Sequence, residues 1–160
     1  MKILNTLLLE DEGEFAKSVV DSLYPHIVEW ADNLIDFNSL LYEDPKVRAY
    51  DLVFLDLHLD IPDSHLELLL GEVPQMKDFT ACTVRSIPLY GLDYFKAKVL
   101  TDSTTKDIAK EKFVLLSGHA RIVRMEALFE KHRIDFPYER LLDKAVIFNK
   151  RLKEFITLTD

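Results

Sequence analysis

One short stretch, Asp51 to Asp60, constrains the fold of this chain more than any other. Within it, Leu52 to Leu55 is an uninterrupted apolar run, which is typical of a strand buried on both faces of a parallel sheet. The run ends at a carboxylate, Asp56. Open α/β sheets bind ligands along the edge where the strands end, so Asp56 is predicted to lie at such an edge. A bare carboxylate there is costly unless it holds a metal or carries chemistry.

Apolar runs and amphipathic segments alternate along most of the chain. The patterns predict strands over 6–9, 27–30, 52–55, 113–120 and 140–144, and helices over 14–24, 34–42, 91–100, 121–132 and 146–158. Residues 101–112 are expected to form a polar connector. Five alternating units imply an α/β protein with a doubly wound parallel sheet.

The stretch from about residue 60 to residue 90 interrupts this alternation. It contains Pro62, Pro74 and Pro88 and is far longer than the usual connection of about 2–6 residues in an α/β unit. We therefore expect an insertion with some structure of its own, including a helical segment over 64–70. The leucines of that segment are expected to pack on the body of the domain, with an interaction surface as the alternative.

Length, charge and cysteine content narrow the class of protein. A chain of 160 residues suits a single domain over 1–160. The net charge of −8 argues against a nucleic-acid surface. No apolar run approaches the roughly 20 residues of a membrane span, and the N-terminus does not resemble a signal peptide. The single cysteine, Cys82, fits a reducing cytoplasm and is expected to be unreactive.

The residues that follow the predicted strands form one chemical set. Glu10 and Asp11 follow the first strand, Asp56 the third, Ser117 the fourth and Lys144 the fifth. An aspartate can act as a nucleophile toward phosphorus, and the acidic group offers the oxygen ligands that Mg²⁺ prefers. A lysine and a hydroxyl can stabilise the oxygens of a transferring phosphoryl group. This set therefore predicts phosphoryl chemistry at one edge of the sheet.

In this order the four motifs resemble the receiver domain of two-component response regulators. The resemblance covers almost the whole chain outside the insertion, and it implies a flavodoxin-like (CheY-like) sheet with strand order 2-1-3-4-5. It also implies that Asp56 accepts a phosphoryl group from a histidine kinase or a histidine phosphotransfer protein. By the family pattern, the ligands of a Mg²⁺ ion would be Glu10, Asp11, Asp56 and the backbone carbonyl of His58.

The resemblance further implies a signalling module rather than a metabolic enzyme. Phosphorylation adds negative charge and would draw Ser117 toward the phosphate, switching the end of the fourth strand between two states. The output surface would be the following helix, the fifth strand and the last helix, which would contact a downstream protein target. The last helix is expected to end the chain at Asp160, which favours a stand-alone receiver.

Three features depart from the family pattern. Ala145 occupies the position after the lysine where receivers usually carry proline, and Leu141 occupies the position of the switch aromatic. Phe136 and Tyr138 lie nearby and are candidates to replace that aromatic. The insertion after Asp56 could cap the site, restrict the partner or form a homodimer surface, and the sequence does not choose among these.

Two histidines occupy positions that, in this family, influence the lifetime of the phosphoryl group. His58 and His119 lie two residues beyond Asp56 and Ser117. We hypothesise that one of them shields or orients the attacking water. The alternative is that both are exposed loop residues.

Each strand-end residue also has an ordinary structural explanation. Asp56 could cap a helix, and the acidic pair could be a solvated turn. Ser117 could be a turn residue, and Lys144 could form a surface pair with Asp143. Helix capping would not call for the other three motifs, however, which favours the chemical interpretation.

Two other functions stay open at this point. A haloacid-dehalogenase-type phosphohydrolase also uses Asp, Ser or Thr, Lys and Mg²⁺, but its nucleophile opens the chain and is followed two residues later by a second aspartate, where this chain has His58. A receiver-like binding module that ignores phosphate is the second alternative. The complete charged set argues against it, because a relaxed site does not need these groups to face one another.

Overall fold

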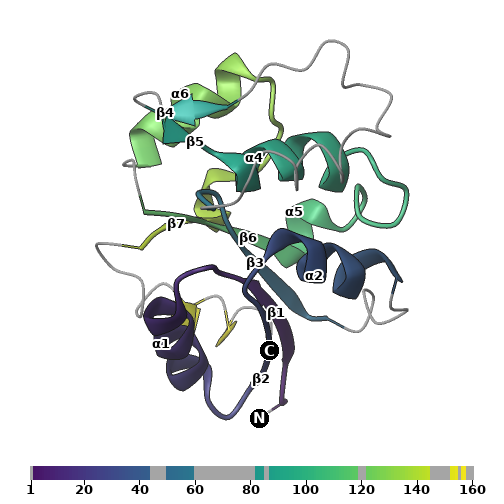
Figure 1. The fold of residues 1–160 in the computed structure, drawn as a ribbon, viewed down its shortest axis with the longest axis vertical. Coiled ribbons are helices and arrows are strands. Elements are labelled where there is room, and N and C mark those ends of the chain that lie inside the picture. The colour runs from purple at the N-terminus through teal and green to yellow at the C-terminus, as the bar shows by residue number, and fades with distance from the viewer. Residues whose placement is uncertain are drawn as a thin grey trace.

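A computed structural model describes residues 2–43, 50–59, 82–84, 87–118, 122–144, 152–154 and 156–157. At its centre lies a five-stranded parallel sheet with strand order β2-β1-β3-β6-β7 (Figure 1). The strands are β1 (Asn5–Leu9), β2 (Ile27–Ala31), β3 (Leu52–Asp56), β6 (Phe113–Ser117) and β7 (Leu141–Asp143). Numbered among themselves, these strands have the order 2-1-3-4-5, which confirms the predicted doubly wound, CheY-like topology.

The two inner strands, β3 and β6, are buried along their whole length, as their apolar sequences predict. Strand β3 pairs with β1 through Leu9 and Leu55 and with β6 through Asp56 and Leu116. Strand β2 forms one edge of the sheet and is half exposed. Because all five strands run parallel, the residues that follow them gather at one edge.

Helices cover both faces of the sheet. They are α1 (Gly13–Leu23), α2 (Leu34–Asn38), α4 (Tyr90–Tyr94), α5 (Ala109–Lys112) and α6 (Ile122–Lys131), with a 3₁₀ turn η5 (Tyr138–Arg140) before β7. Helices α2 and α4 continue directly into π-helical turns, η1 (Ser39–Glu43) and η4 (Phe95–Val99). Residues 152–154 and 156–157 are also helical.

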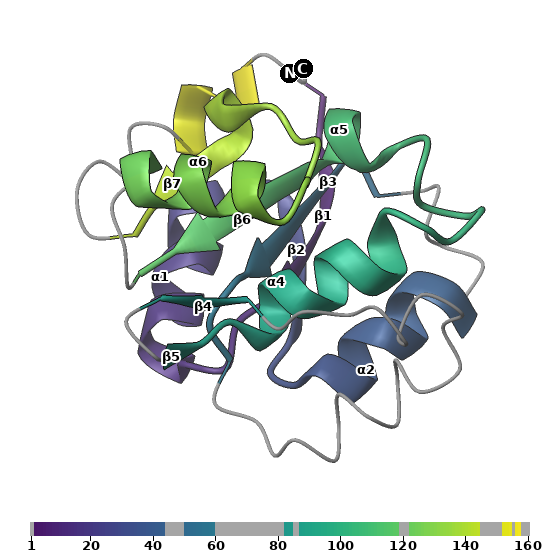
Figure 2. The ribbon, with the colours of Figure 1, turned by 90° about the horizontal axis from the view of Figure 1, so that it is seen from above.

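Each face of the sheet has its own hydrophobic core. One core packs α2, α4 and α6 against the sheet through residues such as Phe37, Phe95 and Phe129. The other packs α1 and the C-terminal helical residues Leu152 and Ile156 against the opposite face. Figure 1 shows α1 across the strands from α2, α4 and α6, and Figure 2 shows α2 and α4 side by side. The strand ends lie between these two layers.

The structure corrects several predicted boundaries. The polar connector over 101–112 ends in the short helix α5, and the strand predicted over 140–144 is shortened to β7 because η5 takes up Arg140. The strand predicted over 113–120 ends at Ser117 in β6. The helices predicted over 34–42 and 91–100 are π-helical in their second halves. The segment 64–70, His119 and Ala145 lie outside the described residues.

The described end of the insertion has structure of its own, as predicted. Strands β4 (Thr83–Val84) and β5 (Ile87–Pro88) form an antiparallel pair. The backbone N–H of Cys82, just before β4, donates to a carboxylate oxygen of Asp93 in α4 at 2.7 Å. Both residues are buried. The hairpin is therefore fastened to the helix that follows it.

Helix α4 is in turn packed directly on the backbone at the end of β3. The N–H of Gly91 donates to the carbonyl of Leu57 at 3.0 Å, and a side chain at position 91 would clash with the carbonyl oxygen of Asp56. Glycine is the residue that permits such a close backbone approach. The start of α4 is thereby held against the residue predicted to carry the chemistry.

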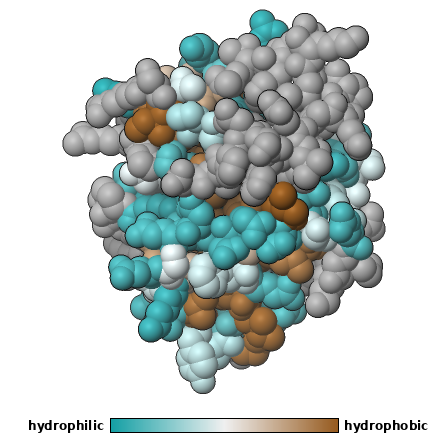
Figure 3. All heavy atoms as spheres, in the orientation of Figure 1, coloured by the Kyte–Doolittle hydropathy of each residue, from teal (hydrophilic) through white to brown (hydrophobic). Residues whose placement is uncertain are grey.

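The described surface is largely polar on the side shown in Figure 3, where hydrophilic side chains separate small hydrophobic patches. Among the described residues, the exposed large apolar or aromatic ones are Ile3, Val20, Tyr24, Ile27 and Trp30. Within the described ranges, no helix has the length and apolar character needed to cross a membrane.

Candidate functional site

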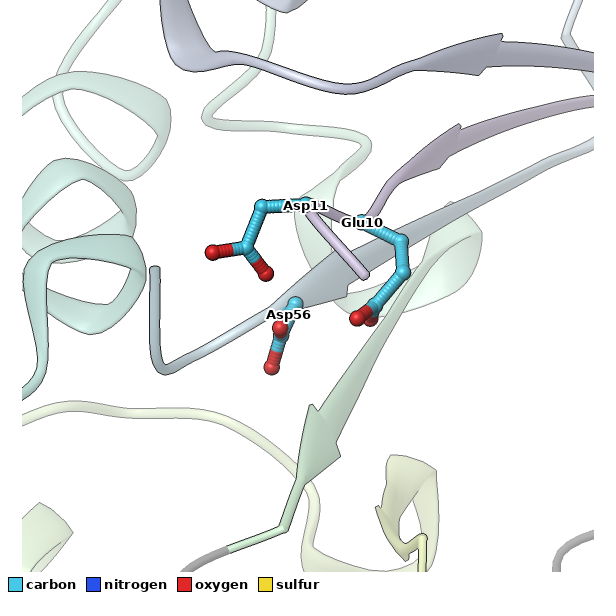
Figure 4. A group of neighbouring side chains, drawn as sticks. All are labelled: Glu10, Asp11 and Asp56. Carbon is cyan, nitrogen blue, oxygen red and sulfur yellow. The ribbon is translucent and has the colours of Figure 1, made fainter. Parts of the chain in front are cut away.

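Three carboxylates meet where β1 and β3 end. Glu10 and Asp11 follow β1, and Asp56 is the last residue of β3. One ligand oxygen from each of the three lies within 4.8 Å of the others. Figure 4 shows the three side chains next to one another, two from the segment after β1 and one from the strand beside it. Glu10 and Asp56 are buried, and Asp11 is half buried.

The ammonium group of Lys144 lies between two of these carboxylates. Its Nζ donates to Oε2 of Glu10 at 2.6 Å and pairs with Oδ2 of Asp56 at 3.0 Å. The lysine side chain is only 14% exposed. It also lies over the ring of Phe15, with Nζ 4.4 Å from the ring centroid. The structure therefore makes Lys144 part of the acidic group, and this position differs from the alternative of a surface pair with Asp143.

Burial and the neighbouring charges shift the acidity of this group. Burial raises the pKa of Asp56 to about 8; the Lys144 ammonium opposes this shift, and the Glu10 carboxylate adds to it. Burial also raises the pKa of Glu10. For Lys144, burial favours the neutral form, but the attraction of Asp56 and Glu10 outweighs it and raises the pKa. The Lys144 ammonium thus balances negative charge on both Glu10 and Asp56.

Backbone N–H groups donate hydrogen bonds to the carboxylate oxygens of Glu10 and Asp56 that do not pair with Lys144. The N–H of Glu12 donates to Oε1 of Glu10 at 3.2 Å. The N–H of His58 donates to Oδ1 of Asp56 at 3.3 Å. Such bonds orient both carboxylates and favour their charged forms.

Ser117 ends β6 beside the acidic group. It is buried, and it is aligned with Asp143 of β7, one position beyond the Leu116–Asp56 pair. Its backbone carbonyl accepts the N–H of Lys144 at 2.9 Å. The fourth and fifth strand ends are therefore joined at the two residues predicted to contact a phosphoryl group.

A cleft of about 330 Å³ opens over these side chains. The residues that line it are Glu10, Asp11, Glu12, Phe15, Asp56, His58, Gly118 and Lys144. All of the sequence-predicted site residues in the described chain except Ser117 line this cleft, and Ser117 is adjacent to Gly118. His58 is at the cleft, where it would have to be to influence water.

The donor set of the acidic group fits a divalent magnesium-like cation. Three carboxylates supply hard oxygen ligands from one side of an open cleft, and Mg²⁺ is usually held by one or two carboxylates while it retains several waters. The group therefore can hold a divalent metal. Whether the backbone carbonyl of His58 would be a further ligand stays a prediction.

Sequence reasoning missed two aromatic residues at this site. Phe15 covers the Lys144 ammonium, and the indole N–H of Trp30 donates to the carbonyl of Glu10 at 2.7 Å. Phe15 lies within the helix predicted over 14–24, which does not indicate a contact with residue 144, and no local pattern connects Trp30 with residue 10. Such contacts depend on strand pairing and could not be inferred from spacing.

The candidate replacements for the switch aromatic lie in the larger core. Phe136 is buried, with its ring 5.3 Å from that of Phe95 and 6.4 Å from that of Phe129, measured between centroids. Tyr138 is half buried, and its ring lies 6.3 Å from Phe129. Both are tied to α6 through Phe129, whereas Leu141 is buried within β7.

Comparison with known proteins gives a structural likeness only. No family model matches the sequence, and no curated protein matches it. The bacteriophytochrome response regulator AtBRR matches over 98% of this chain and 92% of its own, with 15% identity and a TM-score of 0.57. The signal receiver domain of a DNA-binding response regulator from Colwellia psychrerythraea 34H matches over 96% and 98%, with 16% identity and a TM-score of 0.53.

A third solved structure, the Mn²⁺-bound form of the response regulator Rcp1, matches over 97% of this chain and 91% of its own. It is 15% identical, with a TM-score of 0.53. Together with the strand order, these matches show that the chain has the CheY-like fold of response regulator receivers along nearly its whole length.

Proposed function

We propose that this chain, whose fold is that of response regulator receivers, accepts a phosphoryl group on Asp56 and signals through protein contacts. The observation that carries the proposal is the Lys144 ammonium, which lies 2.6 Å from a Glu10 oxygen and 3.0 Å from an Asp56 oxygen, with Asp11 alongside. A buried carboxylate, an acidic pair and a cation around an open cleft are the parts that phosphoryl transfer to an aspartate requires.

In the proposed reaction, a carboxylate oxygen of Asp56 forms a bond to phosphorus while the bond between phosphorus and a histidine nitrogen of the donor breaks. The electron pair stays on that nitrogen, which takes up a proton. Lys144 is already held at Asp56 and would stabilise the charge on the transferring oxygens. Ser117 would contact the phosphate once the phosphate is attached to Asp56. This contact would displace the end of β6 and, through the pairing of the two strands, the end of β7.

Magnesium is the metal we propose for Glu10, Asp11 and Asp56. When bound, it would neutralise charge on the phosphoryl oxygens and favour the ionised form of Asp56. The fit of three carboxylates to one cation supports this assignment, and the Mn²⁺-bound form of Rcp1 shares the fold. The backbone carbonyl of His58 is proposed as a further ligand.

The proposed partners are a histidine kinase or histidine phosphotransfer protein upstream and a separate protein target downstream. A single cysteine suits the reducing cytoplasm, where we place this exchange. The output surface would be formed by α6, β7 and the last helix, because α6 comes after Ser117, β7 leads directly into Lys144 and the last helix comes after Lys144. A change at Ser117 would reach Phe136 and Tyr138 through the contacts of α6.

The test is the intact mass of the protein after exposure to acetyl phosphate, with and without Mg²⁺. We expect an adduct of one phosphoryl group that requires Mg²⁺ and is absent from Asp56→Asn. Asp135→Asn is a matched control, because it removes an exposed carboxylate far from the strand ends and should leave the adduct unchanged.

Other outcomes would identify the alternatives. An adduct that persists in Asp56→Asn would place the chemistry at another residue. Turnover of a generic phosphate ester would favour a haloacid-dehalogenase-type hydrolase. If neither acetyl phosphate nor a histidine kinase phosphorylates the chain and Mg²⁺ does not bind, a phosphate-independent binding module is the better account.

A further inference from the structure

Trp30 is the only tryptophan in the chain, and its indole N–H donates to the carbonyl oxygen of Glu10 at 2.7 Å. It lies on the edge strand β2, opposite Leu8 of β1, and its side chain reaches past the end of β1. The ring also passes over the start of α1, where a Cβ on Gly13 would lie 3.8 Å from it. Trp30 thus bonds to residue 10 at one end of the turn and lies close to residue 13 at the other.

From this geometry we infer that Trp30 is a positioning residue for the acidic site, which it holds through the backbone of Glu10. The inference rests on the proposed function, because it concerns the metal-binding arrangement of the same carboxylates. Trp30 does not touch the cleft-facing oxygens. It acts on the peptide unit that joins Glu10 to Asp11 and therefore on the direction in which both side chains leave the chain.

Every polar group of Glu10, in the backbone and in the side chain, forms a hydrogen bond. Its N–H donates to the carbonyl of Ala31 at 3.1 Å, and its carbonyl accepts the Trp30 indole. Its two carboxylate oxygens accept the N–H of Glu12 and the Lys144 ammonium. Because a peptide carbonyl that loses its only strong donor turns to find another or water, removing the indole N–H would free the Glu10–Asp11 peptide to rotate.

The N–H and the ring of Trp30 can be separated experimentally. The side chain is 45% exposed, so replacing it does not open a cavity in either core. Trp30→Phe lacks both the N–H and the outer ring whose Cη2 atom faces Gly13. Replacement of Trp30 by 3-benzothienylalanine keeps the two-ring shape and changes only the N–H to sulfur. Ile27→Ala is a control on the same strand, because Ile27 is also exposed and lies away from the cleft.

The experiment measures the dissociation constant of Mg²⁺ alone by titration calorimetry for each variant, together with the midpoint of thermal unfolding. We expect Trp30→Phe and the benzothienyl variant to bind Mg²⁺ about fivefold more weakly, the effect of losing one net hydrogen bond. Ile27→Ala should bind like the wild type. In the wild type, Mg²⁺ should change the fluorescence of Trp30, and Asp56→Asn should reduce that change.

The outcomes separate this inference from the proposed function. If the wild type binds Mg²⁺ and the benzothienyl variant binds it equally well, Trp30 does not position the site, although the proposed function stands. If the benzothienyl variant binds normally while Trp30→Phe is weaker and less stable, the ring acts only by packing, and the inference is wrong. If the wild type itself binds no Mg²⁺, the proposed metal site is wrong, and the inference about Trp30 is wrong with it.

Discussion

Two buried aspartates, one at the end of β3 and one in α4, have opposite surroundings. Asp56 is 2% exposed and Asp93 is 1% exposed, and burial raises the pKa of both. Asp56 pairs with the Lys144 ammonium beneath an open cleft. Asp93 instead accepts the backbone N–H of Cys82 and belongs to the anchoring of a hairpin. Burial alone therefore does not distinguish the two aspartates; the neighbouring cation and the open cleft do.

The residue next to each carboxylate shows the same contrast. The cation at Asp56 also pairs with a second carboxylate, Glu10, in a group of carboxylates that could hold a metal. At Asp93 the neighbour is the Cys82 thiol, whose pKa is raised to about 12 by burial and by the Asp93 charge. Such a thiol stays protonated and unreactive at neutral pH, as the sequence predicted. The Asp56 region is a charged group at an open cleft, whereas the Asp93 region is a buried structural contact.

The largest effect should come from removing the cation of the first region. Lys144→Ala leaves Glu10 and Asp56 buried together without a counter-charge, which should lower the free energy of unfolding by about 3–5 kcal/mol in metal-free buffer. Mg²⁺ should restore part of this loss, because it would take the place of the ammonium. Urea unfolding with and without Mg²⁺ measures both effects.

A matched lysine gives the control. Lys110 pairs with Asp135 on the surface, where both side chains are more than half exposed, so Lys110→Ala should cost at most about 1 kcal/mol. Equal losses in the two variants would contradict the assignment of Lys144 to a buried acidic group.

The second region should respond to the loss of an acceptor rather than of a charge. Asp93→Ala leaves the buried N–H of Cys82 unsatisfied and should lower the free energy of unfolding by about 1–3 kcal/mol. Asp93→Asn keeps an acceptor oxygen and should cost less. Unlike Lys144→Ala, neither variant should be rescued by Mg²⁺. Rescue of Asp93→Ala by the metal would show that the two regions are not distinct.

A smaller difference should appear in the pH dependence of stability. Because burial raises the pKa of Asp93 above its ordinary value of 3.8, the folded state binds this proton more tightly than the unfolded state. The resulting stabilisation is complete below about pH 4 and is lost as the pH rises through the raised pKa. Each pKa unit of separation contributes about 1.4 kcal/mol.

Asp93→Asn cannot ionise and should not show this loss. Subtracting its free energy of unfolding from that of the wild type, at a series of pH values from 4 to neutrality, isolates the contribution of Asp93 from those of Asp56 and Glu10. The wild type should become progressively less stable relative to the variant as the pH rises. A flat difference would mean that Asp93 keeps its ordinary pKa in the folded protein, and a difference of opposite sign would mean that its pKa is lowered; either result contradicts the prediction.

The apolar runs of the sequence were sufficient to predict the sheet and its edge. Three or four consecutive apolar residues before Glu10, Asp56 and Ser117 indicated buried strands, and the alternation with helices predicted their parallel order. The charged residues at the strand ends then had to meet. The meeting of these strand-end residues follows from the order of the strands, and that order could be predicted from the hydrophobic pattern of each segment.

The missed parts depend on contacts between residues that are distant in sequence. Nothing near Asp93 indicates that its partner is a backbone N–H eleven residues earlier. The hydrogen bond from Trp30 to Glu10 likewise arises from the register of β2 on β1. The π-helical turns after α2 and α4 were missed because an apolar helical period does not report one extra residue in a turn. Periodicity predicts which face is buried but does not identify the partner.

The backbone contact between β3 and α4 has a consequence in polymer terms. Leu57 and Gly91 are joined by a hydrogen bond of 3.0 Å, so the chain between them is a loop whose two ends are already fixed in place. The entropic cost of closing a loop grows slowly, by about 0.6 kcal/mol for each doubling of its length. The end of β3 is therefore held by this backbone contact itself, and its geometry depends little on how many residues separate Leu57 from Gly91 along the chain.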